Sequence, residues 1–566
     1  MLKNTYFWLF TLASMVYVLG LDITVMDVDS AQYASISREM AETGNYLQVQ
    51  HRGMDYLDKP PLLFWVNALL FSIFGVADWV FKLGSFLFTI LGVYSTFRLG
   101  KILYNAETGR LAALLLYTCQ AFFLFNNDVR TDTMLTSAVV FAIWQMTEWL
   151  HNRKWKWLIG GAVGIALAML AKGPVGLMVP VLALGSYILG RKSWKDLYRW
   201  QYLVLVLIVA VLLSPMLYGL YQQFDAQPEK TTLMVSPDGL REEKGVSGLK
   251  FYLWTQSFGR ITGENVWEDT SGPFFFVHNF LWSYLPWAFL FIFAFFTRIR
   301  QAFLDLIWAG RVPEMLTSMG FLLPFIILSM SSYKLPHYIF VLYPLASILT
   351  AWWWNEKVFG KNKQHPWLVM SMIFQTLIAV ASGILVFFIQ FRFFPGTPVW
   401  ITILTIVGFA AGLYALITFR RSRLHLIIGA ALISITLNLT MNAHFYPSIM
   451  LYQAGNQVAD YVNKRQIDPE ELFFFNTFSY SLGYYVQHSI LVGTYDVLND
   501  RLDKGESAYL LTTEEHLDQL RSDFNLGTIQ EFNTFKVTRL SMKVLMPDQR
   551  KNNFEKFYLV QIKARK

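Results

Sequence analysis

The sequence predicts a polytopic α-helical membrane protein with a small α/β domain at its C-terminal end. Charged residues make up 15% of the 566 residues, against about 25% in soluble globular proteins. Hydrophobic residues make up 54% and aromatic residues 17%. Because a soluble surface needs more charge than this, a soluble multidomain protein is excluded. The net charge of +8 is typical of basic cytoplasmic loops and does not indicate a nucleic-acid partner.

Fourteen apolar runs are the candidate membrane helices, because about 20 apolar residues cross a bilayer as a helix. They lie at 5–25, 61–76, 80–99, 110–126, 133–150, 157–171, 174–190, 202–221, 275–297, 315–331, 337–354, 367–390, 399–419 and 424–443. The run 61–76 is short and starts at the double proline Pro60-Pro61. These two features favour a helix that lies on the membrane surface.

The basic loops decide the topology, since Lys and Arg concentrate on the cytoplasmic side. If 61–76 does not span, six basic loops share the side of Lys3. They are the loops within 98–110, 153–156, 191–199, 298–311, 357–363 and 420–423. If 61–76 spans, all six lie on the opposite side. We therefore expect about thirteen transmembrane helices, with the N-terminus in the cytoplasm and the C-terminus outside.

This topology divides the chain into two predicted domains. Residues 1–445 form the transmembrane domain, whose first outer loop, 26–79, carries interfacial helices, and whose loop 222–273 is also outside. Residues 446–566 carry most of the charge of a soluble domain and alternate short β-rich runs with helical stretches. That alternation is typical of a small α/β domain, which the topology places on the outer (periplasmic) face.

Acidic residues cluster where the first helix leaves the membrane. Asp22, Asp27 and Asp29 are followed by Tyr33 in a stretch that reads as an amphipathic interfacial helix. A carboxylate at the membrane boundary can act as a general base toward a substrate at the same boundary. Alternatively, these acids cap the interfacial helix, because Asp is favoured at helix starts.

Three lysines beside proline-stiffened turns are predicted on the outer face, where few lysines are expected. They are Lys59, Lys172 and Lys334, and the last is followed by His337 and Tyr338. Lysines at one interface can converge on a phosphate group, and proline fixes the direction in which each is presented. The alternative is that they are ordinary lysines at helix ends whose ammonium groups reach the headgroups.

Two further outer segments could contribute to a site. The turn Asn126–Asp132 contains Asp128 and Asp132 and could hold a sugar or a metal, or could be only a solvated connection. The loop 222–273 is long enough to shape or cover a site beside the membrane. Both predictions depend on the topology derived from the basic loops.

A metal site is conceivable but has no motif to support it. The candidate ligands are Asp58, Asp269 and a histidine such as His278, and their spacing matches no known ligand pattern. The single cysteine, Cys119, excludes a disulfide within the chain and a multi-cysteine zinc site. No cofactor is required by anything in the sequence, although a divalent metal remains possible.

Four segments together resemble the protein mannosyltransferase-like membrane glycosyltransferases, which have the GT-C fold. The branch that the chain resembles most is the bacterial aminoarabinose transferases of lipid A. The likeness covers residues 1 to about 445, with the segments in the same order, and extends only loosely to the tail. The four segments are 29–40, 56–61, 171–174 and 333–338.

The resemblance implies a reaction and roles for the residues. It implies an inverting transfer of a sugar from a polyprenyl-phosphate donor to a lipid A-like glycolipid or another envelope acceptor, on the outer face of the bacterial inner membrane. It implies that Asp29 is the catalytic or acceptor-orienting carboxylate and that Lys59, Lys172 and Lys334 bind phosphate. The chain departs from the aminoarabinose branch at Asp58, where that branch has Glu, and at Ser30, where an acid often follows the first Asp.

Three other functions stay open at this point. A protein O-mannosyltransferase-type enzyme would use the same kind of donor and act on secreted protein, and an envelope oligosaccharide polymerase or ligase would use a longer donor. A transporter or flippase for a lipid-linked solute should carry charges at mid-bilayer and show repeat symmetry. Here the polar groups gather on one face and the two halves differ, which favours the enzyme.

Overall fold

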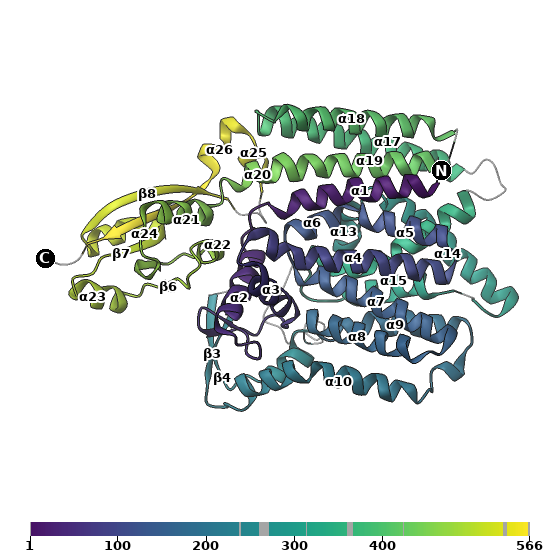
Figure 1. Ribbon diagram of the computed structural model, residues 1–566, viewed down its shortest axis with the longest axis horizontal. Coiled ribbons are helices and arrows are strands. Elements are labelled where there is room, and N and C mark those ends of the chain that lie inside the picture. The colour runs from purple at the N-terminus through teal and green to yellow at the C-terminus, as the bar shows by residue number, and fades with distance from the viewer. Residues whose placement is uncertain are drawn as a thin grey trace.

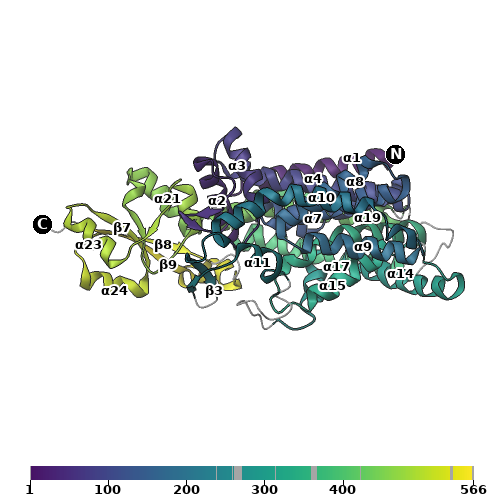
Figure 2. The ribbon, with the colours of Figure 1, turned by 90° about the horizontal axis from the view of Figure 1, so that it is seen from below.

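The computed structural model is elongated, with a helical bundle that carries a smaller α/β region at one end (Figures 1 and 2). The structure describes residues 2–236, 239–257, 259, 271–312, 314–358, 366–420, 422, 424–535 and 540–563. The N-terminus lies at the free end of the bundle, and the C-terminus lies at the far end of the α/β region.

Long apolar helices form the bundle and run roughly along the long axis of the molecule (Figure 1). Among the described residues, seven helices are long and apolar enough to cross a membrane, or eight if one bent pair counts as a span. The chain is therefore a multi-pass α-helical membrane protein. The bundle helices are α1 (Leu2–Leu21), α4 (Asp78–Leu103), α5 (Ala106–Tyr117), α6 (Gln120–Asn127), α7 (Thr131–Asn152), α8 (Trp155–Lys172), α9 (Val175–Gly190), α10 (Gln201–Leu220), α13 (Phe275–Ser283), α14 (Ala288–Ala309), α15 (Leu316–Ser329), α16 (Tyr343–Trp353), α17 (Pro366–Phe387), α18 (Val399–Ile417) and α19 (Leu424–Thr440).

The periphery of the bundle is apolar and its interior is packed. Leu203 of α10 is 73% exposed and Ile406 of α18 is 63% exposed, as expected of side chains that face lipid. One large apolar cluster runs through the interior and includes Leu114, Ala138 and Ile348, all fully buried. The bundle therefore presents apolar surface both inward and outward.

Two predicted continuous helices are broken, so that part of the sequence prediction was wrong. The run 110–126 divides into α5 and α6, which meet at an angle of 51°. The run 275–297 divides into α13 and α14, and the break contains Pro286, which has no N–H to donate. The run 337–354 starts as a 3₁₀ turn, Pro336–Leu342, before α16 begins.

Two helices close the end of the bundle that faces the α/β region (Figure 1). They are α2 (Asp29–Thr43), which ends at the left-handed Gly44, and α3 (Leu62–Phe74). At 13 residues α3 is shorter than the roughly 20 needed to span, which favours the predicted interfacial position. It buries Phe64 and leaves Ile73 62% exposed.

Short elements complete the outer end. The hairpin of β1 (Gln50–His51) and β2 (Met54–Asp55) lies between α2 and α3 in the sequence. The hairpin of β3 (Thr231–Ser236) and β4 (Gly239–Lys244) and the short α11 (Gly248–Lys250) come from the predicted loop 222–273. The hairpin of β3 and β4 lies beside α2 in Figure 1.

A five-stranded mixed sheet forms the centre of the α/β region, in the order β6-β5-β7-β9-β8. β5 pairs in parallel with β6 and β7, while β9 pairs antiparallel with β7 and β8. Helices lie on both faces of the sheet (Figure 2). The strands are β5 (Leu472–Phe474), β6 (Leu491–Val492), β7 (Ala508–Thr513), β8 (Leu526–Thr534) and β9 (Glu555–Ile562), and the helices are α20 (Tyr446–Met450), α21 (Ala454–Arg465), α22 (Tyr480–Tyr485), α23 (Tyr495–Asp503), α24 (Glu514–Asp523), α25 (Met542–Leu545) and α26 (Pro547–Asn553).

Candidate active site

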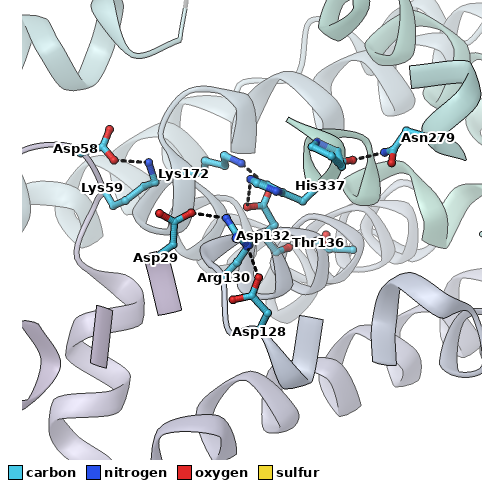
Figure 3. Close-up of polar contacts among 11 residues, drawn as sticks. Asp29, Asp58, Lys59, Asp128, Arg130, Asp132, Thr136, Lys172, Asn279 and His337 are labelled. Atoms are coloured by element: carbon cyan, nitrogen blue, oxygen red, sulfur yellow. Dashed lines mark hydrogen bonds and ion pairs between the residues drawn. The ribbon is translucent and has the colours of Figure 1, made fainter. Parts of the chain in front are cut away.

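Charged side chains from separate segments converge at the bundle end that faces the α/β region (Figure 3). They come from the start of α2, the loop before α3, the turn between α6 and α7, the end of α8 and the turn before α16. All of these positions are helix ends or connections. Such positions suit charged groups, because the ends of membrane helices lie at the polar interface.

The first group is an ion chain of two carboxylates around one guanidinium. Arg130 donates to Asp29 through one terminal nitrogen and to Asp128 Oδ2 through Nε at 2.9 Å. Burial raises the pKa of Asp128, and Arg130 opposes that rise. The Asp29 side chain, by contrast, is 38% exposed. Arg130 therefore fixes the direction of a carboxylate that remains accessible to solvent.

The second group surrounds a buried carboxylate in the first turn of α7. Lys172 Nζ donates to Asp132 Oδ1 at 2.5 Å, and His337 Nε2 lies 3.7 Å from Asp132 Oδ2. The ammonium of Lys172 also lies 4.1 Å from the centre of the Tyr338 ring. Asp132 is only 3% exposed, so these contacts hold the lysine at the end of α8 in one place.

The third group is a neighbouring pair in the loop before α3. Lys59 Nζ donates to Asp58 Oδ2 at 2.6 Å, and the Asp58 side chain is 47% exposed. The other oxygen of Asp58 accepts from Gln256 Nε2 at 3.4 Å. Pro60 and Pro61 follow directly and lead into α3, so the loop presents Lys59 from a stiff backbone.

Lys59 and Lys172 line one pocket, which is partly open to solvent. Apart from the two ammonium groups, its wall is mainly apolar. The other lining residues are Leu135, Pro174, Val175, Met178, Gln256, Ser257, Ile327, Leu328, Ser331 and Tyr338. Two cations at an apolar cavity suit an anionic group that is joined to a hydrocarbon chain.

The remaining predicted residues lie close by but differ in their surroundings. Tyr33 is 3% exposed and packs edge-to-face on Phe64, with ring centres 5.8 Å apart. Burial and the nearby carboxylates of Asp29 and Asp58 raise the pKa of Tyr33. Lys334 is 9% exposed and donates to the carbonyl of Ser271 at 3.3 Å. It is not among the residues that line the pocket, so two of the three predicted lysines meet there.

The suggested metal ligands do not gather in the part of the chain that the structure describes. There, no three His, Cys, Asp or Glu side chains lie close enough together to hold a metal ion. Asp269 lies outside the described residues, Asp58 pairs with Lys59, and His278 lies in α13.

Arg130 and Tyr56 belong to the site but were not predicted as site residues from the sequence. Arg130 could have been found by the same signal as the lysines, because it is a cation on the predicted outer face. Tyr56 is 9% exposed, and its hydroxyl has no hydrogen-bond partner in the described structure. Burial and the carboxylates of Asp58 and Asp29 raise the pKa of Tyr56. The one sequence feature that indicated a role for Tyr56 is its position in the motif 56–61.

The chain is similar to proteins of the kind that the motifs resemble. The family model described as dolichyl-phosphate-mannose-protein mannosyltransferase matches residues 58–218. Two curated relatives are undecaprenyl phosphate-alpha-4-amino-4-deoxy-L-arabinose arabinosyl transferases. The one from Pseudomonas fluorescens is 25% identical over 64% of this chain and 59% of the relative, and the one from Edwardsiella ictaluri is 25% identical over 59% and 56%. The alignments thus span less than two thirds of either relative.

Solved structures match over nearly the whole chain. ArnT from Cupriavidus metallidurans in the apo state has a TM-score of 0.72 at 17% identity, covering 99% of this chain and 98% of ArnT. ArnT bound to undecaprenyl phosphate has the same TM-score at 18% identity, covering 98% and 97%. The chain therefore has the fold of ArnT, and its predicted resemblance to protein mannosyltransferase-like membrane glycosyltransferases is confirmed.

Proposed function

We propose that this chain is an inverting glycosyltransferase that moves a sugar from a polyprenyl-phosphate donor to a lipid A-like glycolipid or another envelope acceptor. One observation carries the proposal. An accessible carboxylate, Asp29, lies at the same end of the bundle as an apolar pocket with two fixed ammonium groups, Lys59 and Lys172. The names of the relatives make the undecaprenyl-phosphate ester of 4-amino-4-deoxy-L-arabinose the first donor to test.

We assign each group a role in the proposed transfer. Lys59 and Lys172 hold the donor phosphate, and the apolar wall takes the start of the prenyl chain. The acceptor oxygen attacks the anomeric carbon from the face opposite the phosphate. The bond between that carbon and the phosphate oxygen breaks, and its electron pair leaves with the polyprenyl phosphate, whose charge the lysines stabilise.

Asp29 acts on the acceptor. If the acceptor is a hydroxyl, the Asp29 carboxylate takes its proton as the new bond forms. If the acceptor is a phosphate, no proton needs to be removed, and Asp29 orients the acceptor or stabilises the positive charge at the anomeric carbon. Arg130 holds Asp29 in place in both cases. The proposed reaction needs no cofactor.

A transfer assay with defined lipids tests the function. The purified protein in vesicles should convert lipid A and the aminoarabinose donor into lipid A that is heavier by one aminoarabinose residue. Mass spectrometry of the envelope lipids of a deletion strain should show loss of the matching glycolipid. Transfer to a secreted protein alone would favour the protein-directed alternative. Movement of intact donor across the membrane without transfer would contradict the proposal and favour a flippase.

We also propose the orientation that the basic loops predict: thirteen spanning helices, the N-terminus in the cytoplasm, and residues 446–566 as a domain on the outer face of the inner membrane. The termini lie at opposite ends of the long axis, which supports this arrangement (Figures 1 and 2). The candidate site includes Asp29 at the start of α2, and α2 lies at the bundle end that faces the α/β region (Figure 1).

Reporter fusions should give a definite pattern for this orientation. A reporter after Asn105 should be active only in the cytoplasm, and reporters after Asp55 or at the C-terminus should be active only outside, because lysine and arginine loops resist translocation. Cysteine labelling at positions 58 and 78 should proceed from outside at both, since 61–76 does not span. A cytoplasmic C-terminus, or labelling of position 78 only from inside, would contradict the proposed topology.

A further inference from the structure

The segment that leads into Asp29 is held by side chains from the α/β region. The Asp27 carboxylate accepts from the backbone N–H of Ser481 at 3.0 Å, from the Ser481 hydroxyl at 2.6 Å and from the Ser479 hydroxyl at 3.1 Å. Ser481 and Ser479 are 0% and 4% exposed. Asp27, one of the acids that the sequence offered as a candidate base, is therefore occupied by a structural contact.

The backbone of the same segment is held as well. Gln453 accepts from the N–H of Asp27 at 2.9 Å and donates to the carbonyl of Val25 at 3.0 Å. The N–H of Val25 donates to the Tyr485 hydroxyl at 2.8 Å, and that hydroxyl donates to Asp78. Two residues beyond Asp27, helix α2 begins at Asp29.

The far end of α2 contacts the same region. Glu39 accepts from the Ser489 hydroxyl at 3.0 Å and from the N–H of Arg52 at 2.7 Å. The guanidinium of Arg52 lies 3.8 Å from the centre of the Phe478 ring and 5.0 Å from that of Phe474. Thus the α/β region forms hydrogen bonds both to the segment before the first residue of α2 and to α2 near its last turn.

The packing leaves little room for this contact to shift. Gly455 of α21 lies against the two serines, and a Cβ at this position would clash with both hydroxyls and with the N–H of Leu482. The Ser479 hydroxyl also accepts from that N–H at 3.4 Å. The serines are therefore fixed between α21 and Asp27, in one orientation.

We infer that the α/β region sets the position of the Asp29 carboxylate through a latch formed by Asp27, Ser479 and Ser481, which makes these three positioning residues for the transfer reaction. The latch holds the start of α2, and Arg130 then holds the Asp29 side chain from the bundle side. This inference rests on the proposed function and extends it, because it gives the α/β region a part in catalysis.

Steady-state kinetics in vesicles test the latch. The variants are Asp27→Asn and the double variant Ser479→Ala/Ser481→Ala. The matched control is Ser522→Ala, whose hydroxyl donates to neighbouring groups on the exposed surface of α24. We expect kcat to fall by about 10- to 100-fold in both latch variants, because small misplacements of a reacting group are costly. The donor KM should stay within about twofold, since Lys59 and Lys172 lie on other segments.

Two further readouts separate positioning from a loss of folding. Adding Asp27→Asn to Asp29→Asn should cause little further loss of kcat, because the latch acts through Asp29. Ser479→Ala alone, which leaves both bonds of Ser481 to Asp27 in place, should retain most of the activity that the double serine variant loses. Unchanged kcat in the latch variants, or losses in kcat that add fully to those of Asp29→Asn, would overturn the inference.

A structural readout separates failure of the latch from failure of the proposed function. If the wild-type protein transfers no sugar, the proposed function fails, and the latch is judged by hydrogen exchange alone. Amides at the start of α2 should exchange at least about tenfold faster in the latch variants than in Ser522→Ala, because the latch resists local opening. Equal exchange in the variants and the control would overturn the latch whatever the reaction is.

Discussion

Replacing Asp29 by Asn is expected to lower the turnover of sugar transfer by about 100- to 10,000-fold, the range that general-base catalysis contributes. The change removes the charge and the basic lone pair but keeps the shape of the side chain. Arg130 retains its bond to Asp128, so the thermal stability should change little. Transfer to a hydroxyl acceptor and unfolding temperature, measured on the same preparation, check both parts of this prediction.

The matched control for this variant is Glu42→Gln in the same helix. Glu42 pairs with Arg38 near the end of α2, and its side chain is 51% exposed. We expect nearly normal turnover, because the glutamine keeps an oxygen that can accept from Arg38 and lies thirteen residues along the helix from Asp29, roughly 20 Å away. If Asp29→Asn also turns over normally, the base must be another carboxylate of the site, and Asp58, which is 47% exposed beside Lys59, would be the first to test.

Replacing Lys172 by Ala is expected to raise the donor KM by about 10- to 100-fold, because a hydrogen bond to a charged group contributes roughly 1.5–3 kcal/mol. Lys59→Ala should act in the same direction. The double variant should lose less than the two single losses combined, since both lysines serve one phosphate. Lys172→Arg should only partly replace the lysine, because the planar guanidinium differs from a compact ammonium.

Stability can be separated from donor binding by a second change at the same place. Lys172→Ala leaves Asp132, 3% exposed, with a missing partner, and breaking a buried ion pair costs about 3–5 kcal/mol. Adding Asp132→Asn should restore much of the unfolding temperature but not the donor KM. Lys334→Ala is the comparison, because Lys334 is not among the lining residues. Small, additive losses that affect stability alone would contradict a shared phosphate site.

The sequence predicted the positions of most bundle helices well, because two strong patterns mark where they begin and end. Apolar runs and basic loops report where helices begin and end, so α7, α8 and α9 lie within a few residues of the predicted runs. The bend between α5 and α6 has no such signal, because both sides of Thr118 and Cys119 are apolar. The break before α14 did have one in Pro286, whose effect on the run 275–297 was missed.

The sequence predicted which types of residue gather on one face of the membrane. It did not predict which of these side chains contact one another. Lys59 and Lys172 were found because the predicted topology places them on the outer face, where few lysines are expected. The sequence could not tell that Asp132 would bind Lys172 while Asp27 would bind Ser481, because such contacts depend on which distant segments fold together. Nor could it separate Lys334, which bonds to Ser271, from the two lysines of the pocket.

The contact between Asp27 and Ser481 joins residues 454 positions apart in the chain. At a translation rate of about 5–20 residues per second, the ribosome needs roughly 20–90 seconds to make the second partner after the first. During that interval every intervening segment is made before the first outer loop can meet its partner. A chain that ends before Ser481 therefore lacks the contact that holds the start of α2, even though every helix of the bundle has already been made.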